Sequence, residues 1–541
     1  MNELLIVIPA VKKNVAFPDD LVKKLAGVPL IQRTLAIATA MVSKDQVLVV
    51  TDSKEIELIC ERQGVMSLCD PALRLPSDST VLLVLVEYLR GHTGKWKDLL
   101  MLSSYVPLLR EETLKSAYEQ YCRNGAEFMV PVVRLKSRPY SPWPKSLQDW
   151  FLSGSRQEST IESTAFYIVS RSLLGDKSGR EIQPVAFPLD EHLIEIHSYH
   201  DWWLCEKLIN RRRIVFRVIG NEAVGMGHIF HCLALAHEIS DHEVYFVCDK
   251  ESRVATNKLA GYDYWLGVYE HEAIEQAIID LKPDIVVNDI LDTDACYIHF
   301  LRKHGIRVVN FEDLGSGAAE ADLTINDLYD EPLLPGDRIV WGHGWFFLRD
   351  EFNDARPQRF QKKVGRLLIT FGGTDPSDYT RRVLILVAPY CAKHGIAIDV
   401  VTGDGYSHME DLEALIARLP GEVVYSHATG IISRIMEEAQ FAICSNGRTV
   451  YELAHMNIPA LVLSHHAREK SHRFACEDNG FFPVDIPNGP EHDPMILKAL
   501  QRLVEDTDYR HQLFNNMKDH GFVENKHKIV ERLQSLLGQK R

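Results

Sequence analysis

A short glycine segment followed by a histidine is the first feature of the sequence that could do chemistry. Gly225-Met226-Gly227-His228 lies between the apolar stretch 214–219 and the segment 229–239, whose apolar residues recur at helical spacing. A strand, a glycine turn and a helix N-terminus together form an anion site, because glycine lets backbone N–H groups approach a phosphate. We expect His228 at the mouth of this site, where an imidazole can act as an acid, a base or a ligand for water. The alternative is a tight turn with a surface histidine.

Two glycine-containing segments further along the chain could bind a nucleotide. Gly372-Gly373-Thr374 follows an apolar strand pattern, and its backbone N–H groups and threonine hydroxyl could wrap a diphosphate. Ser445-Asn446-Gly447 lies between a strand pattern and a helix pattern, where the backbone could contact a base. Both segments can also be plain turns, since Gly-Gly and Asn-Gly are common turn dipeptides.

A loop rich in titratable side chains follows the apolar segment 460–463. Residues 464–474 contain histidines, arginines, a glutamate and a lysine. We expect the side chains that face a substrate to be Arg468, Glu469 and His472. The histidines do not have the spacing of zinc ligands, so we predict no metal here. The alternative is a polar, partly solvated loop.

The composition is that of an ordinary globular protein. The 541 residues are 46% hydrophobic and 25% charged, with a formal net charge of −15. This charge argues against nucleic acid or an anionic membrane as the main partner, although a local basic pocket could still hold a phosphorylated substrate. The ten cysteines are scattered without a Cys-x-x-Cys pair, and no apolar run approaches the roughly 20 residues that span a bilayer. We therefore predict a cytoplasmic protein without a membrane span.

The chain is long enough for several domains, and its patterns divide it into three α/β regions. We place these regions at 1–210, 211–355 and 356–541, with the run Arg211-Arg212-Arg213 at the first boundary and the polar segment 351–364 as a hinge or linker near the second. The strands predicted in the first region are 4–9, 47–51, 98–102 and 128–132. Two similar α/β lobes that face a cleft describe the B-type glycosyltransferase architecture, in which ligands bind at the carboxyl ends of the strands.

The first region resembles the sugar cytidylyltransferases that make CMP-sialic acid and related compounds. The likeness rests on Ile8-Pro9-Ala10, on segments 25–34 and 49–56, and on 201–206. It implies a nucleotidyltransferase-like domain that uses CTP with Mg²⁺ as its cofactor.

Several residues of the first region depart from that family. Val11 stands where the family has an arginine, and Asp19 and Asp20 place negative charge where the triphosphate would lie. Two carboxylates repel a triphosphate unless a metal bridges them. The metal-binding Asp-Ile-Asp of the family is replaced by Glu195-Ile196-His197. An active cytidylyltransferase and a degenerate, non-catalytic module both remain open.

Residues 214–480 resemble the UDP-sugar hydrolases of pseudaminic acid biosynthesis and the related spore-coat polysaccharide proteins. The matching segments, in chain order, are 225–228, 232–236, 310–314, 321–326, 347–352, 369–376, 445–454 and 458–460. The resemblance implies that His228 activates a water that attacks the anomeric carbon of a nucleotide sugar, with no metal and no other cofactor. Gly225, Gly227 and the later glycine segments would then hold the diphosphate.

Glu452 has two alternative roles. Related nucleotide-sugar enzymes use a glutamate on this helix to bind ribose hydroxyls, which the resemblance extends to Glu452. Thr449-x-x-Glu452 is also a capping box, in which the glutamate reaches back to the start of its own helix. We leave both interpretations open, with Thr449 as a further nucleotide contact in the first.

Residues 214–480 also depart from the family that they resemble, and these differences leave the reaction open. Ile219 and His231 stand where the family commonly has an acidic residue and an arginine, and the loop 464–474 replaces an Asn-Gln pair. Hydrolysis of a UDP-linked amino sugar and transfer of the sugar to an acceptor are therefore both considered, with a small-molecule nucleotide sugar as the partner and a homo-oligomer left open. We expect a neutral His228, because its ordinary pKa is ~6.5 and a helix N-terminus disfavours the protonated ring.

Overall fold

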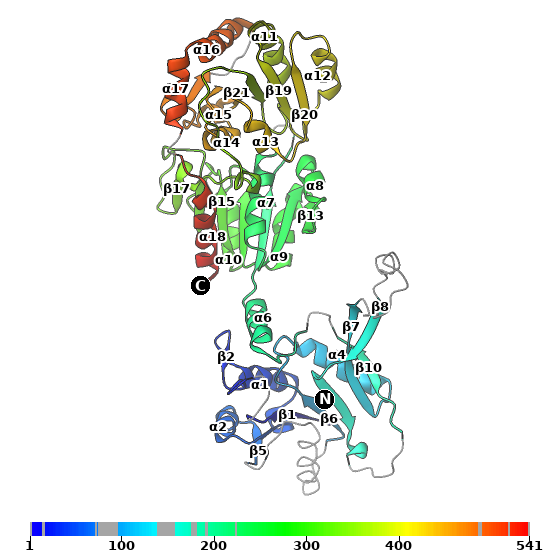
Figure 1. Ribbon diagram of the computed structural model, residues 1–541. Helices are drawn as coiled ribbons and strands as arrows, with labels where there is room; N and C mark the ends of the chain where they lie inside the picture. The colour runs from blue at the N-terminus through cyan, green and yellow to red at the C-terminus, as the bar shows by residue number, and fades with distance from the viewer. Residues whose placement is uncertain are drawn as a thin grey trace, which may run out of the picture. The chain divides into compact units, whose positions relative to one another are not determined.

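The computed structural model describes residues 3–12, 17–70, 73, 96–137, 157–174, 181–189, 193–221, 224–484, 490–517 and 520–538. The chain divides into two compact units, Met1–Arg211 and Arg212–Arg541 (Figure 1). Sheets with helices packed against them make up both units, which confirms the predicted α/β class. Within the described ranges, no helix has both the length and the apolar composition that crossing a bilayer requires.

The first unit is built on one mixed sheet of eight strands in the order β10-β7-β9-β6-β1-β4-β5, with β8 beside β7. Its strands are β1 (Leu4–Ala10), β4 (Val47–Thr51), β5 (Met66–Cys69), β6 (Asp98–Leu102), β7 (Phe128–Ser137), β8 (Gln157–Glu162), β9 (Phe166–Ser170) and β10 (Val185–Pro188). The central strands β1, β4 and β6 pair in parallel, whereas β9 runs antiparallel to β6 and β7. The four predicted strands are all present.

Helices and short elements complete the first unit. The helices are α1 (Leu30–Met41), α2 (Lys54–Gln63), α4 (Glu111–Arg123) and α6 (Tyr199–Ile209), the 3-10 turns are η1 (Lys44–Gln46) and η2 (Arg171–Leu173), and a small hairpin joins β2 (Lys24–Leu25) to β3 (Val28–Pro29). The apolar faces of α1 and α4 pack on the buried strands β1 and β6 to form the main core of the unit.

The second unit contains two parallel sheets, one in each lobe. The first lobe has the strand order β13-β12-β11-β14-β15-β16-β17 and the second has the order β20-β19-β18-β21-β22-β23. In both sheets the first strand lies centrally, with the chain first progressing to one side and then crossing to the other. The crossover points lie between β11 and β14 and between β18 and β21, and this is where doubly wound sheets bind ligands.

The inner strands β11, β14, β15 and β16 of the first lobe are buried along almost their whole length, as expected where helices cover both faces of a parallel sheet. The strands of this lobe are β11 (Arg213–Val218), β12 (Glu243–Asp249), β13 (Trp265–Tyr269), β14 (Ile285–Asp289), β15 (Arg307–Phe311), β16 (Leu323–Asn326) and β17 (Ile339–Trp341). The helices are α7 (Gly227–Glu238), α8 (Arg253–Leu259), α9 (Ile274–Leu281) and α10 (Ala295–Lys303), with the 3-10 turns η3 (His271–Ala273), η4 (His343–Trp345) and η5 (Asp350–Phe352).

The second lobe follows the same plan. Its strands are β18 (Arg366–Thr370), β19 (Ala397–Thr402), β20 (Val423–His427), β21 (Phe441–Ser445), β22 (Ala460–Leu463) and β23 (Phe481–Val484). Its helices are α11 (Tyr379–His394), α12 (Met409–Ile416), α13 (Ile432–Met436), α14 (Thr449–His455), α15 (Ala467–Lys470), α16 (Asp493–Glu505) and α17 (Thr507–Asn516), with η6 (Glu477–Asn479) and η7 (Pro490–His492).

The last helix, α18 (Val523–Gly538), differs from the predicted division of the chain. We assigned residues 356–541 to the second lobe, but Ile529, Val530 and Leu533 of α18 are buried in the core of the first lobe, against α7 (Figure 1). The apolar face of α18 finds its buried surface there. The chain therefore crosses between the lobes a second time.

Candidate functional site

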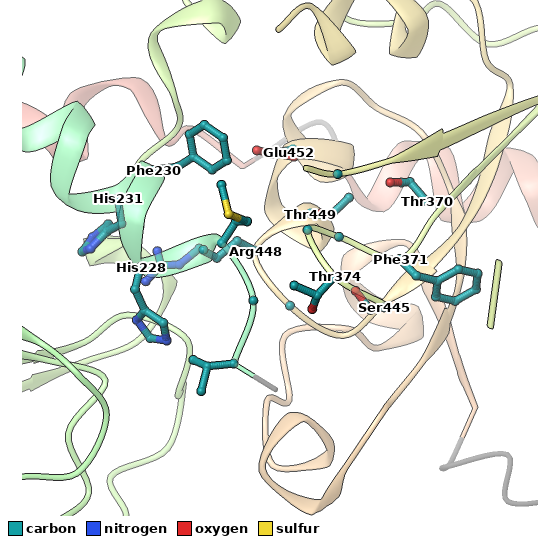
Figure 2. Close-up of a pocket in the computed structure, with 18 of the residues that line it drawn as sticks. His228, Phe230, His231, Thr370, Phe371, Thr374, Ser445, Arg448, Thr449 and Glu452 are labelled. Carbon is teal, nitrogen blue, oxygen red and sulfur yellow. The ribbon is translucent and has the colours of Figure 1, made fainter. Parts of the chain in front are cut away.

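A cavity of about 500 Å³ lies between the two lobes of the second unit (Figure 2). Its size suits a small-molecule ligand. The loops that follow β11, β18 and β21 line it, at the crossover points of both sheets. The predicted residues that line the cavity are Gly225, Gly227, His228, Gly372, Gly373, Thr374, Ser445, Gly447, Thr449, Glu452, Arg468, Glu469 and His472. The fold therefore gathers nearly all of the predicted residues in one place.

The glycines allow the two lobes to approach closely. Gly225 and Gly372 have φ angles of +86° and +81°, which favour glycine. A Cβ atom on Gly373 would lie 2.6 Å from Cγ of Met226 in the facing lobe, so a side chain there cannot be accommodated without a shift. The glycine segments of the two lobes thus lie against each other at the cavity, with their backbones as its lining.

His228 is paired with a carboxylate that we did not predict. It lies in the first turn of α7, and its Nδ1 is 2.6 Å from Oδ1 of Asp289, the last residue of β14. Oδ2 of the same carboxylate lies 2.8 Å from Nδ1 of His231, one turn along α7. One buried carboxylate therefore positions two imidazoles on the same helix face.

The pKa of His228 is shifted in the direction opposite to the one predicted from the helix N-terminus. The ring is only 5% exposed, so it does not lie at an open mouth. Burial disfavours the charged ring, but the carboxylates of Asp289 and Glu312 outweigh burial and raise the pKa of His228. We predicted a neutral ring from its ordinary pKa of ~6.5 and from the helix N-terminus, and missed these two acids. Burial would raise the pKa of Asp289, yet the two histidines lower it well below its usual range, so this carboxylate stays ionised.

His231, Cys232 and Asp289 form a group whose potential ligand atoms all lie within 4.8 Å of one another, close enough to hold a metal ion. We predicted no metal for this region. The three atoms already satisfy one another, because the thiol of Cys232 donates to the same carboxylate oxygen that His231 contacts. The ring of His231 also packs between Phe311 and Phe347, with centroids 4.4 and 4.5 Å away. Hydrogen bonding and packing therefore engage all three side chains, while Nε2 of His231 is buried without a hydrogen-bond partner among the described residues.

Arg448 was not predicted as a site residue, although it lines the cavity. It immediately precedes α14 and reaches across to the first lobe, where it forms ion pairs with Glu312 and with Asp327. Figure 2 shows it between His228 on α7 and Thr449 on α14. Burial opposes its charge, but the carboxylates raise the pKa of Arg448 above its ordinary value. Glu312 has a φ of +51°, an uncommon backbone conformation for a non-glycine residue.

Sequence signals existed for the acids around Arg448 and His228. Asp289, Glu312 and Asp327 each stand at or just after the end of an apolar strand of the first lobe, β14, β15 or β16. Carboxyl ends of parallel strands meet at one edge of the sheet. A search of those strand ends for titratable residues would have found all three.

Glu452 does not form the capping box that the sequence allowed. Arg448 occupies the N-cap position of α14 without a side-chain cap, which leaves Thr449 inside the first turn. Oε1 of Glu452 instead accepts a hydrogen bond from Nε of Arg349 at 2.9 Å, and Glu452 lines the cavity. Burial raises the pKa of Glu452, and the arginine opposes this shift. The carboxylate points toward the cavity side of the helix, which leaves ribose binding as its predicted role.

Asn446 is the one predicted nucleotide-binding residue that does not line the cavity. It is 6% exposed, and its amide donates to the carbonyl oxygens of Glu469 at 2.8 Å and His472 at 3.1 Å. In return, Nδ1 of His472 donates to the carbonyl oxygen of Asn446 at 2.9 Å. The predicted contact with a base is therefore corrected: Asn446 ties the loop after β22 to the end of β21.

The loop after β22 brings its three predicted residues to the cavity. Arg468 pairs with Asp292 at 2.9 Å and donates to the carbonyl oxygen of Glu312, which joins the two lobes. Burial raises the pKa of Glu469 to about 7. Burial lowers the pKa of His472, so its ring is neutral. The loop is thus packed at these three positions, while His466, Lys470 and Arg473 are exposed, as the partly solvated alternative has it.

The first unit places its family-specific positions differently from the prediction. Asp20 is fully buried and its Oδ1 accepts from the backbone N–H of Leu21 at 2.7 Å, so it does not face a triphosphate. Asp19 is exposed and pairs with Lys12 at 3.1 Å. The neighbouring residues 13–16 lie outside the described part of the chain.

Glu195 lies where the family has a metal-binding aspartate. Its carboxylate accepts hydrogen bonds from the hydroxyl of Ser163 at 2.6 Å and from the backbone N–H and hydroxyl of Thr164, both at 2.9 Å. Both oxygens of Glu195 thus already have protein partners.

The two Rossmann-like lobes with a cavity between them define the B-type glycosyltransferase architecture predicted from the sequence. Residues 7–144 match the family model described as Cytidylyltransferase. The first unit therefore carries a cytidylyltransferase-type domain, as the resemblance implied.

Curated relatives match part of the chain. The protein is 24% identical over 264 residues to "Uncharacterized protein MJ1062" of Methanocaldococcus jannaschii, and the match covers 45% of this chain and 54% of that protein. It is 25% identical over 259 residues to "Spore coat polysaccharide biosynthesis protein SpsG" of Bacillus subtilis, covering 45% of this chain and 75% of the relative. The chain thus spans about half of the first relative's length. The suspected likeness to the spore-coat proteins is confirmed.

Solved structures also match parts of the chain. MurG of Acinetobacter baumannii has a TM-score of 0.44 at 14% identity and covers 60% of this chain and 99% of its own. The spinosyn forosaminyltransferase SpnP has a TM-score of 0.42 at 15% identity, covering 61% and 100%. A CMP:2-keto-3-deoxy-manno-octonic acid synthetase bound to CTP has a TM-score of 0.30 at 13% identity, covering 38% and 98%.

Proposed function

We propose that the second unit hydrolyses a UDP-linked amino sugar to UDP and the free sugar, as part of the biosynthesis of a surface glycan or a nonulosonic acid. The observation that carries this proposal is the His228–Asp289 pair in a cavity whose walls are glycine segments from both lobes. The name of SpsG, which refers to polysaccharide biosynthesis, supports the pathway.

The geometry of the pair fits a base that activates water. Because Asp289 remains ionised, it accepts the Nδ1 proton of His228, and the lone pair of a neutral ring then lies on Nε2. A water oxygen would bond to the anomeric carbon while the bond from that carbon to the diphosphate oxygen breaks. The water proton would pass to Nε2, and Asp289 would stabilise the imidazolium that forms.

Each wall of the cavity would bind one part of the nucleotide sugar. Backbone N–H groups at Gly227 and Gly373 would meet the diphosphate, with the α7 N-terminus adding its positive dipole. Glu452 would accept the ribose hydroxyls. Arg468, Glu469 and His472 would face the sugar. The reaction needs no metal in this scheme, since His228 supplies the base, and the backbone N–H groups with the α7 dipole stabilise the negative charge of the departing diphosphate.

Transfer of the sugar to an acceptor hydroxyl is the second candidate, because the two-lobed architecture and the relatives support it equally. The two reactions differ only in the nucleophile that His228 deprotonates. The full-length protein incubated with UDP-linked acetamido sugars and EDTA tests the difference, with UDP and free sugar separated by ion-exchange chromatography. Release of both without an acceptor supports hydrolysis, and UDP release only after a glycan acceptor is added contradicts it.

A matched pair of variants tests the base. We expect His228→Ala to lose at least about 100-fold in turnover, the usual contribution of a positioned base. His299→Ala removes an exposed histidine on α10 and serves as the control. Full turnover in His228→Ala rules out our assignment of the base.

A further inference from the structure

The cationic side chains of the cavity are all engaged by carboxylates. Four lysine and arginine residues line the cavity within the described chain: Lys258, Arg349, Arg448 and Arg468. Lys258 pairs with Asp404 at 3.1 Å, and Arg349 pairs with Glu452 at 2.9 Å. Arg448 pairs with Glu312, and Arg468 pairs with Asp292 at 2.9 Å. A nucleoside diphosphate is multiply charged, so it has to share or displace one of these pairs to enter.

Arg448 is the cation placed against the glycine segment. A Cβ atom on Gly227 would lie 3.3 Å from Cδ and 3.4 Å from Nε of Arg448, so the arginine side chain fills the space that this glycine leaves open. Lys258 pairs with Asp404 in a partly exposed position, and Arg349 is bound to the carboxylate proposed for the ribose. Arg448 is therefore a cation that lies directly against Gly227, whose backbone N–H group is expected to meet the phosphates.

Arg448 also has donors to spare. A guanidinium carries five N–H donors, and the pairs with Glu312 and Asp327 run through one N–H of each terminal nitrogen. The side chains of Glu312 and Asp327 are 6% and 0% exposed, so they hold the arginine in a fixed orientation. Their two negative charges outweigh its single positive charge, which weakens the attraction for an anion while the cavity is empty.

We propose that Arg448 binds the diphosphate of the nucleotide, and that Glu312 competes with that diphosphate for the guanidinium. This inference rests on the proposed function, because it assigns the diphosphate-binding cation of the same site. The ligand class is a nucleoside diphosphate or its sugar ester. Glu312 and Asp327 keep Arg448 pointed into the cavity until the phosphates arrive, and the nucleotide then draws the two lobes together through the same side chain.

Competition for the guanidinium predicts that substitutions of Arg448 and Glu312 change UDP affinity in opposite directions, which a purely structural arginine would not produce. UDP binding to the full-length protein is measured by calorimetry, with uridine as the ligand that lacks phosphates. We expect Arg448→Met to weaken UDP binding at least about tenfold and to leave uridine binding unchanged, since charge-assisted bonds to phosphate are lost. We expect Glu312→Gln to strengthen UDP binding several-fold, because the competing carboxylate is gone. Arg448→Met leaves two buried carboxylates unpaired, so Arg448→Met/Glu312→Gln provides a second variant that restores the charge balance.

The double variant also isolates the pair. We expect the gain from Glu312→Gln to disappear in the Arg448→Met background, whereas a simple change of net charge would persist there. Arg434→Met and Glu438→Gln on the exposed surface control for that change. UDP affinity that is unaffected in Arg448→Met, or that falls in Glu312→Gln, overturns the inference. If this binding pattern is found but no hydrolysis occurs, only the proposed hydrolase activity is overturned. A wild-type protein that does not bind UDP overturns both that activity and the role of Arg448.

Discussion

Nδ1 of His228 lies 2.6 Å from Oδ1 of Asp289, across a sequence separation of 61 residues. The carboxylate is 0% exposed and ends β14, while the imidazole begins α7, so the β11–β14 crossover brings them together. Because Asp289 fixes Nδ1 as the donor, the second ring nitrogen is the one available for chemistry. The carboxylate thus acts as a positioning residue for the imidazole.

Asp289→Asn should reduce turnover strongly without removing the site. The amide can donate to Nδ1 and so stabilise the wrong tautomer of His228, which leaves the lone pair on the wrong nitrogen. We expect kcat to fall by roughly 10²- to 10⁴-fold with little change in KM. Initial rates of UDP release measure this, and Asp263→Asn at an exposed position is the matched control. A loss confined to KM would show that Asp289 does not act through the tautomer.

The pH dependence of turnover should report the same pair. Burial lowers the pKa of His228, but the carboxylates of Asp289 and Glu312 raise it above its ordinary value of ~6.5. The base is competent only when unprotonated, so kcat/KM should increase with pH through an apparent pKa above 6.5 and then level off. Glu312→Gln removes one of the raising charges, and the rising limb should move to lower pH. A rate that falls with pH over this range would indicate an acid instead of a base.

The sequence predicted the elements of this site better than its contacts. The glycine segments and His228 were found because strand, turn and helix patterns are local, and the strands 47–51 and 98–102 were correct to the residue. Asp289 was missed because its meaning depends on a partner 61 residues away. The antiparallel strand β8 was missed because its residues, Gln157–Glu162, are mostly polar.

Long-range packing also explains the other corrections. The sequence pattern Thr449-x-x-Glu452 allows a capping box, but Arg349 reaches Glu452 from a distant segment and the helix starts one residue earlier. Asn446 has the composition of a turn, and only the fold shows that its amide holds the loop after β22. In both cases a local pattern was correct about polarity, and the partner was set by the tertiary structure.

Glu452→Gln should remove discrimination at the ribose. We expect wild-type protein to bind 2′-deoxy-UDP about tenfold more weakly than UDP, since a hydrogen bond to a charged group is worth about 1.5–3 kcal/mol. The glutamine variant should bind the two ligands with similar affinity, as calorimetry would measure. Glu438→Gln, at a side chain with 55% exposure, should retain the difference. Equal binding of both ligands by wild-type protein contradicts the ribose role.

Arg510 should prove important for stability and not for chemistry. Its side chain is buried and donates to the carbonyl oxygens of Leu503 at 2.6 Å and Lys362 at 2.8 Å, which ties the segment 351–364 to the end of α16. Arg510→Met leaves these carbonyls without donors, and we expect the free energy of unfolding to fall by about 2–4 kcal/mol. Calorimetric unfolding measures the shift, with the exposed Arg434→Met as control. A melting temperature equal to that of wild type would show that water replaces the lost donors.

The first unit should not transfer a cytidylyl group. Three observations argue against a triphosphate site: Val11 stands in place of the family's arginine, Lys12 is held by Asp19 and Glu55, and both oxygens of Glu195 accept hydrogen bonds from Ser163 or Thr164. Hydrogen bonds to Glu55 and Asp19 raise the pKa of Lys12 more than burial lowers it. The ammonium therefore stays charged within this local network.

We therefore expect no pyrophosphate release when the full-length protein is incubated with CTP, Mg²⁺ and a nonulosonic acid, at enzyme concentrations where a cytidylyltransferase would turn over within minutes. An enzyme-coupled pyrophosphate assay measures this. Glu195→Asp shortens the carboxylate and weakens its contacts with Ser163 and Thr164, yet activity should not appear, because the arginine position remains apolar. Pyrophosphate release by wild-type protein would show that the described contacts rearrange around CTP and that the unit is catalytic.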